Sequence, residues 1–210
     1  MAKVVAVTQS ATTLAEVETR FDLVRSVEEN FFSEWQSSLP RLSKQENLSL
    51  DLLYRRLQYH RADGELLEGA VTLLVVAPLL ELAGFYDPPY KLKSEASVEI
   101  SVDDGEETLR GRIDALILQE QLWAIAIEAK KTTIPIRSAL PQLLTYLLAN
   151  PQPNQPLFGL ITNGDEVLFV KLSQVNSMQY DISRAFSLYT IRSELTQVLQ
   201  VLKQLGQATA

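Results

Sequence analysis

The chain has 210 residues, a formal net charge of −7, one histidine and no cysteine. This composition excludes disulfides, thiolate metal centres and histidine-rich zinc sites, so a bound metal would have to be a hard, oxygen-ligated ion such as Mg²⁺. The acidic balance argues against a broadly basic nucleic-acid-binding surface but not against a local basic cleft. The hydrophobic content of 46% suits one compact domain with a full core.

The N-terminal sequence MAKVVAVTQS lacks the long apolar segment of a signal peptide. The longest apolar run, Ala70–Leu80, is well short of the roughly 20 residues that a membrane-spanning helix needs. We therefore expect a soluble, cytoplasmic protein that does not associate with membranes.

The first part of the chain predicts mainly helices. Lys3–Val7 is a short β-type run that predicts either a strand or an ordered tail. Apolar residues at spacings of three and four predict an amphipathic helix over Thr13–Trp35 and a second helix over Ser49–His60. We interpret residues 1–62 as a helical N-terminal extension.

A third helix is predicted over Glu65–Gly84, which is apolar on nearly all sides and should be buried. Pro78 should kink this helix or split it, and Gly84 is a natural C-terminal cap.

From Lys91 onward the apolar period changes to two, which is typical of strands. We expect a turn at Asp103-Asp104-Gly105, a hairpin at Asn163-Gly164-Asp165 and an irregular segment over Ser173–Phe186. The predicted strands are Leu92–Val102, Thr108–Leu118, Leu122–Ala129, Leu157–Thr162 and Glu166–Leu172, and the predicted helices are Ser138–Ala149 and Leu188–Leu205. This order predicts a single α/β domain, in which helices flank a mixed sheet of about five strands.

Polar residues interrupt two of these apolar strands. Asp114 lies in one strand, and Glu128 and Lys130 lie at the end of the next, two residues apart and thus on one face. A same-face register places Asp114 opposite residue 126 or residue 128, so its Cβ would lie roughly 5–8 Å from that of Glu128. Two carboxylates this close repel unless a cation separates them, and a divalent metal is the natural cation. The carbonyl of Ala129 could add a third ligand.

Lys130 could hold an attacking water beside such a metal or stabilise charge on a scissile phosphate. The set therefore predicts a phosphodiester hydrolysis site. The alternative is an ion network at the edge of the sheet, which is the commoner meaning of an isolated E-x-K. Gln142 and Tyr146 lie four residues apart on one helix face, from which both could reach the carboxylates.

The ordered set of motifs resembles the PD-(D/E)XK nuclease superfamily, and within it the N-terminal nuclease domain of the R subunit of type I restriction enzymes, with its RecB-like Q-x-x-x-Y helix. The resemblance covers roughly residues 65–172, which we interpret as a nuclease-like core. A C-terminal helix over 188–206 follows this core. Its motifs here are Gly111-Arg112-Ile113-Asp114, Ile127-Glu128-Ala129-Lys130-Lys131 and Gln142-x-x-x-Tyr146.

The resemblance implies a restriction-endonuclease-like fold and metal binding by Asp114 and Glu128. It implies that Lys130 is the catalytic lysine and that Gln142 and Tyr146 organise the site or contact DNA. The acid that some members carry on the first core helix matches Glu68 best, with Glu65 and Glu81 as weaker alternatives. The residues expected to contact DNA are Arg112, Lys131 and Arg137, together with Arg110 and, further off, Lys91 and Lys93.

Three functions remain open at this point. The leading one is an endonuclease that uses Mg²⁺, or Mn²⁺ in its place, to hydrolyse DNA. No G-x-x-x-x-G-K-[ST] motif is present, so we expect no ATP binding and no DNA translocation by this chain. The second is a catalytically inactive module that binds nucleic acid or a protein, with a partner protein supplying any targeting. The third is an assembly subunit that binds partners through its outer helices. No feature indicates the oligomeric state.

Overall fold

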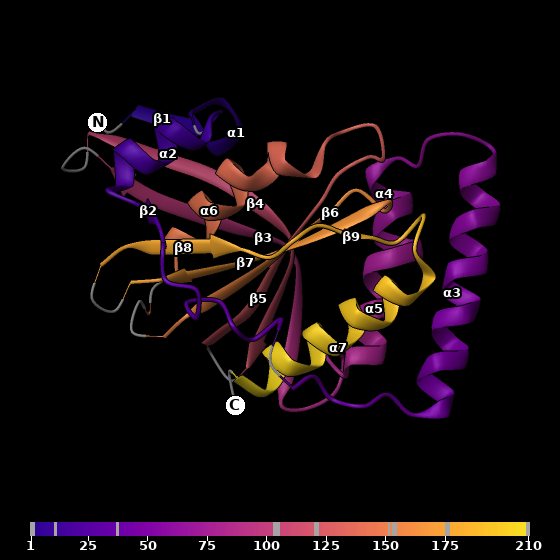
Figure 1. The fold of residues 1–210 in the computed structure, drawn as a ribbon. Coiled ribbons are helices and arrows are strands. Elements are labelled where there is room, and N and C mark those ends of the chain that lie inside the picture. The colour runs from indigo at the N-terminus through magenta and orange to yellow at the C-terminus, as the bar shows by residue number, and fades with distance from the viewer. Residues whose placement is uncertain are drawn as a thin grey trace.

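The computed structural model describes residues 3–10, 12–36, 38–102, 106–119, 122–150, 152, 155–174 and 177–208. In this part of the chain nine strands form one mixed sheet with helices on both faces (Figure 1), which confirms the predicted α/β class. The predicted turn at Asp103-Asp104-Gly105 lies outside the described residues. The strands are β1 Lys3–Ala6, β2 Val24–Arg25, β3 Tyr90–Val102, β4 Glu107–Gln119, β5 Leu122–Ala129, β6 Leu157–Thr162, β7 Glu166–Ser173, β8 Gln179–Ile182 and β9 Phe186–Ser187.

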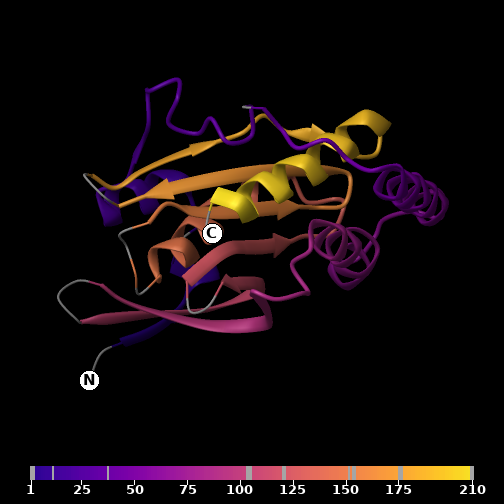
Figure 2. The ribbon, with the colours of Figure 1, turned by 90° about the horizontal axis from the view of Figure 1, so that it is seen from below.

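The strand order is β1-β4-β5-β6-β7-β8-β2, with β3 paired to β4 and β9 paired to β7. The pairs β3–β4, β4–β5, β6–β7 and β7–β8 are antiparallel. β5 and β6 are parallel and are connected through α6. β3 and β4 form a long hairpin that curves along one side of the sheet, with the N-terminal strand beside it (Figure 2).

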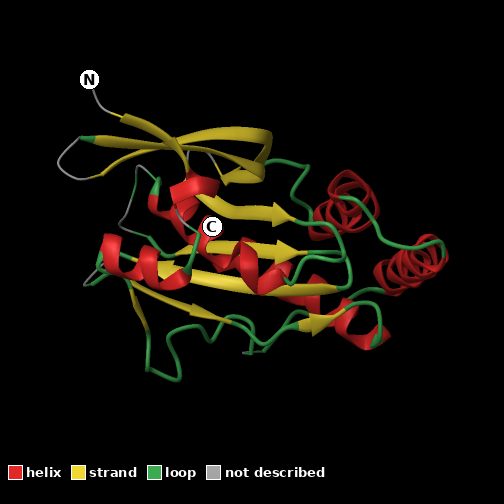
Figure 3. Cartoon of the chain, turned by 90° about the horizontal axis from the view of Figure 1, so that it is seen from above, coloured by secondary structure: helices red, strands yellow, loops and turns green. Residues whose placement is uncertain are grey.

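The helices are α1 Val7–Ser10, α2 Leu14–Phe21, α3 Lys44–Ala62, α4 Glu68–Val71, α5 Ala77–Ala83, α6 Leu140–Leu148 and α7 Arg192–Ala208, with a π-helical turn at Thr72–Val76 and a 3₁₀ turn at Ile136–Ala139. Two apolar clusters fill the two faces of the sheet. One contains the buried residues of α3, α5 and α7, and the other those of α1, α2 and α6. From above, α3 and the α4–α5 segment appear nearly end-on beyond the central strands (Figure 3).

The predicted helix over Thr13–Trp35 is wrong beyond its second turn. Asp22, with a φ of 49°, ends α2 in the left-handed conformation, and Val24–Arg25 then pair with β8. Val17 and Phe32 are buried on opposite faces of the sheet, so one straight helix could not have placed both. The first 62 residues therefore supply two strands of the sheet as well as helices.

The helix predicted over Glu65–Gly84 begins at Glu68 and is interrupted by a π-turn, in which the amide of Ala77 donates to Thr72 five residues back. Pro78 lies two residues after this turn, and its ring excludes regular α-helical hydrogen bonding at that point. Gly84 caps the helix with a φ of 86°, as predicted.

Three smaller differences concern local geometry. The segment predicted to be irregular contains β8, whose four residues are too few for their alternation to be recognised. The last helix begins at Arg192, four residues after the predicted start. The sheet has nine strands because four short ones escaped prediction or were left ambiguous.

No helix in the described ranges is long and apolar enough to cross a membrane.

Candidate active site

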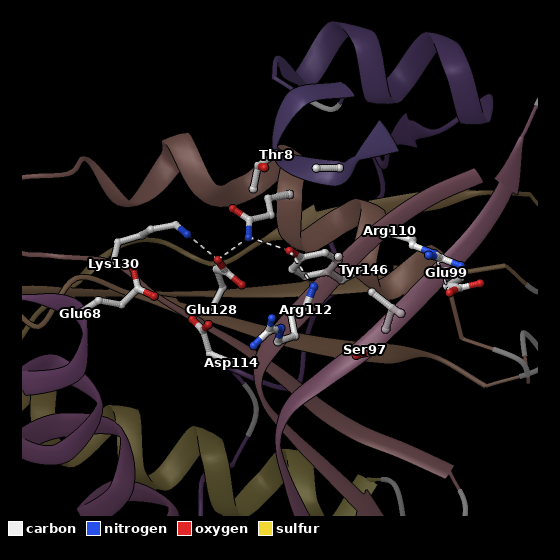
Figure 4. Close-up of a pocket in the computed structure, with 14 residues that line it drawn as sticks. Thr8, Glu68, Ser97, Glu99, Arg110, Arg112, Asp114, Glu128, Lys130 and Tyr146 are labelled. Atoms are coloured by element: carbon white, nitrogen blue, oxygen red, sulfur yellow. Dashed lines mark hydrogen bonds and ion pairs between the residues drawn. The ribbon is translucent and has the colours of Figure 1, made fainter. Parts of the chain in front are cut away.

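Four elements place polar side chains around one cleft of about 670 Å³. Asp114 comes from β4, Glu128 from β5, and Lys130 from the residue just beyond β5. The catalytic candidates Gln142 and Tyr146 of α6 and Glu68 of α4 also line it. Figure 4 shows the labelled members of this set directed into the same space.

The register between β4 and β5 decides between the two predicted arrangements of the carboxylates. Ala115 pairs with Ile127, so the next step along the two strands places Asp114 opposite Glu128. Oδ2 of Asp114 accepts a hydrogen bond of 2.7 Å from the amide of Ala129, which fixes the aspartate at the end of β5.

Glu128 is the most constrained member of the site. Its side chain is 1% exposed, and its Oε1 accepts from Lys130 Nζ at 2.5 Å and from Gln142 Nε2 at 2.6 Å. Its Oε2 is buried and has no hydrogen-bond partner in the described part of the chain. A buried carboxylate oxygen without a partner is costly, so it points to a group that this structure does not contain.

Burial and mutual repulsion perturb the pKa of both carboxyl groups. Burial, followed by the charge of Asp114, raises the pKa of Glu128 to about 7. Burial also raises the pKa of Asp114, although its hydrogen bond with Ala129 opposes the shift. Burial acts to lower the pKa of Lys130, but the adjacent Glu128 outweighs it and leaves the pKa of Lys130 raised. Lys130 therefore stays charged at neutral pH.

Helix α6 positions Glu128 through the hydrogen bond that Gln142 donates to it. Gln142 Nε2 lies 2.8 Å from Tyr146 Oη, and the amide of Arg112 also donates to that hydroxyl at 3.4 Å. The ring of Tyr146 lies against the β4 backbone at Gly111, where an added Cβ would come within 2.3 Å of Tyr146 Cε1. Gly111 is thus required for the close approach of helix and strand, and this approach sets the position of Gln142.

The donor set fits a hard divalent cation in chemistry and in environment. All of the candidate ligands are oxygen atoms, and one of them is the unpartnered Glu128 Oε2. No group of three or more histidine, cysteine, aspartate or glutamate side chains forms a complete metal site among the residues that the structure describes. An ion here would therefore need backbone carbonyl or water ligands besides Asp114 and Glu128.

The other acids near the first core helix are placed differently. Glu65 accepts a hydrogen bond from Thr133 at 2.9 Å and lies 3.8 Å from Lys131 Nζ, whereas Glu81 lines a separate groove. Glu68 alone of the three faces the cleft, and it is exposed.

The cations expected to contact DNA divide into two groups. Arg110 and Arg112 line the cleft, paired with Glu99 at 2.8 Å and with Glu95 at 2.9 Å, respectively. Lys131, Arg137, Lys91 and Lys93 do not line it.

Sequence reasoning missed part of the cleft wall. Ala6 and Thr8 at the N-terminus and Ser97 on β3 also line the cleft. Figure 4 shows Thr8 on the far side of the site from Ser97. The only signal was the β-type run at Lys3–Val7, which could not reveal that β1 would pair with β4.

Comparison with known proteins identifies the family of this chain. Residues 25–177 match the family model described as type I restriction enzyme R protein N terminus. The chain belongs to this family. No curated protein matches it. A solved fragment from Vibrio vulnificus YJ016, described as an HsdR subunit of a type I restriction enzyme, is similar at 18% identity with a TM-score of 0.39. The match covers 65% of this chain and 26% of the Vibrio chain. The chain thus spans about a quarter of the length of that fragment.

Proposed function

We propose that this chain is a metal-dependent nuclease module that hydrolyses phosphodiester bonds in DNA. The observation that carries the proposal is the pair of carboxylates of Asp114, which is half-buried, and Glu128, which is buried; they face each other beside Lys130. Membership in a restriction-enzyme family supports DNA as the substrate.

In this proposal Asp114 and Glu128 hold Mg²⁺ or Mn²⁺, assisted by the carbonyl of Ala129, while Glu68 adds negative charge to the wall of the cleft. When bound, the ion supplies Lewis acidity that activates water and offsets phosphate charge. Lys130 orients the attacking water or stabilises the charge that develops on the phosphate. Gln142 and Tyr146 position Glu128, while Arg110 and Arg112 bind phosphates along the cleft floor.

A DNA substrate would have to approach an acidic chain, so targeting by a partner is part of the proposal. The family model describes the N terminus of the R protein of a type I restriction enzyme. We therefore assign target selection to other parts of such an assembly.

A second candidate is a module of the same fold that binds DNA or protein without catalysis. Both carboxylates already accept hydrogen bonds from within the chain, and both arginines of the cleft are paired with glutamates. Such internal pairing is what an inactive relative would retain. A non-catalytic site would hold no divalent ion at millimolar Mg²⁺ or Mn²⁺.

The direct test is cleavage of a mixture of supercoiled, linear and single-stranded DNA with Mg²⁺ or Mn²⁺ and with EDTA. Wild type should cleave only with metal, and Lys130→Ala should reduce the rate about 10²- to 10³-fold. Lys44→Ala removes a lysine from exposed α3, outside the cleft, and should leave the rate unchanged. Metal-dependent cleavage that persists in Lys130→Ala would contradict the proposal.

A further inference from the structure

The outer face of α3 carries apolar side chains that the fold leaves in solvent. Leu50, Leu53 and Leu57 are buried against the core. On the opposite side Leu48, Leu52 and Tyr59 are 52%, 40% and 71% exposed, at spacings of four and seven residues. These spacings place them in one stripe along the helix. α3 is therefore apolar on two sides, although only one of them packs against the rest of the molecule.

A groove runs beside this stripe, between α3 and the segment formed by the π-turn and α5. Its volume is about 230 Å³, and it is separate from the candidate active site. Ser49 and Arg56 lie on its α3 side and Glu81 on its α5 side. Its apolar lining consists of Leu52, Leu53, Leu73, Leu74, Pro78 and Leu82.

The π-turn forms part of one wall of this groove through Leu73 and Leu74. Leu73, within the turn, is 73% exposed, although the helix around it is apolar and buried. Single π-turns inside α-helices are found frequently at functional sites. Here the turn displays a leucine at the edge of an apolar groove.

The charges at this surface identify the chemistry of a partner. The chain carries a net charge of −7, yet α3 presents Arg55 and Arg56 beside the stripe. Among the described residues neither arginine lies within ion-pair distance of a carboxylate. Three other charged side chains of α3 form ion pairs within the chain: Asp51 with Arg192, Glu46 with Lys203 and Arg61 with Asp165.

We propose that this groove, the α3 groove, docks an acidic amphipathic helix from a partner protein. A helix placed between α3 and α5 would insert apolar residues spaced by three and four positions, and its carboxylates would face Arg55 and Arg56. A second copy of the chain using the same face would bring these arginines against their own counterparts. A membrane surface is too broad to enter this concave groove, whereas a helix can place its carboxylates on the α3 side and a polar residue beside Glu81.

The test uses fluorescence anisotropy with a synthetic helical peptide of about 16 residues that carries leucines at helical spacing and glutamates elsewhere. A second peptide replaces the glutamates with lysines. The acidic peptide should bind wild type and should bind more weakly as salt is raised, whereas the basic peptide should bind at least about tenfold more weakly.

Two variants locate the binding on the groove. Leu73→Ser and Arg56→Glu should each weaken binding of the acidic peptide by about tenfold. Both residues are exposed, so the fold should tolerate the changes, as circular dichroism would verify. Leu67→Ser is the matched control, because Leu67 is 63% exposed but does not line the groove, and it should leave the affinity within about twofold.

Several results would overturn the proposal. They are the absence of peptide binding at millimolar concentration, equal affinity for the two peptides, or an affinity that neither variant changes. Self-association that Leu73→Ser abolishes in light scattering would identify a second copy as the occupant. Binding to phosphatidylserine vesicles that both variants abolish would identify a membrane instead.

Discussion

Glu128 makes the protonation of the cleft sensitive to pH near neutrality, because its pKa lies at about 7 rather than at the ordinary 4.5. Between these values the folded protein holds a proton that the unfolded chain has released. The number of bound protons is then larger in the folded state, so stability falls as pH rises through this window.

We therefore expect the metal-free protein in EDTA to lose free energy of unfolding between pH 5 and pH 8, as measured by urea denaturation. Glu128→Gln should lose less over the same interval, because the variant has no carboxylate to ionise at this position. An equal loss in both proteins would show that Glu128 does not carry the pH dependence.

Gly111 is the second residue on which the geometry depends. Gly111→Ala should lower the free energy of unfolding by about 1–3 kcal/mol, because its Cβ would collide with the Tyr146 ring. Gly69→Ala is the matched control: a Cβ there meets nothing within 4 Å, and alanine in a helix is favoured by up to about 1 kcal/mol. Equal urea midpoints for wild type and Gly111→Ala would contradict the contact.

At the scale of elements, α3 begins with a reciprocal cap. Ser43 accepts a hydrogen bond from the amide of Glu46, and the Glu46 side chain accepts one from the amide of Ser43. Ser43→Ala should lower the free energy of unfolding, measured by thermal denaturation, by about 1 kcal/mol. Ser38→Ala, at an exposed position outside a helix, should change it by less than about 0.5 kcal/mol. A similar effect of both substitutions would show that the cap is not formed.

The long elements could be predicted from the sequence because each carries several periods of its own pattern. β3 to β7 and α6 are found close to their expected limits. β2 and β8 could not be, since their two and four residues are defined by pairing, β2 with β8 and β8 with β7, rather than by local pattern. The helix predicted over Thr13–Trp35 failed for a different reason, because its apolar residues pack on opposite faces of the sheet.

The candidate site was predictable where two motifs meet across adjacent strands. Strand alternation restricted Asp114 to a position opposite residue 126 or 128, and the structure selects Glu128. The wall formed by Ala6, Thr8 and Ser97 was not predictable, because it depends on the N-terminal strand pairing with β4, about 100 residues later. The pairing of Arg112 with Glu95 likewise crosses between strands.

For the whole molecule, the proposed DNA binding would require an acidic chain to bind a polyanion through cleft arginines that are already paired with glutamates. Glu95→Gln should free Arg112 and increase DNA affinity by about two- to fivefold. The slope of log affinity against log salt should steepen by up to about 0.9, as expected for one additional phosphate contact. Glu29→Gln makes the same charge change at an exposed position outside the cleft. If both variants gain equally, net charge and not Arg112 would be the cause.

If the proposed site is a metal site, Asp114 and Glu128 together hold a divalent cation. Calorimetric titration of the protein with Mn²⁺ at pH 8, where Glu128 is ionised, tests this without requiring a DNA substrate. We expect one saturable site whose affinity falls at least about tenfold in Asp114→Asn and in Glu128→Gln. Glu65→Gln, which changes an acid outside the cleft, should leave the affinity unchanged. Failure to bind Mn²⁺ at millimolar concentration, or binding that persists in both cleft variants, would show that these carboxylates do not form a metal site.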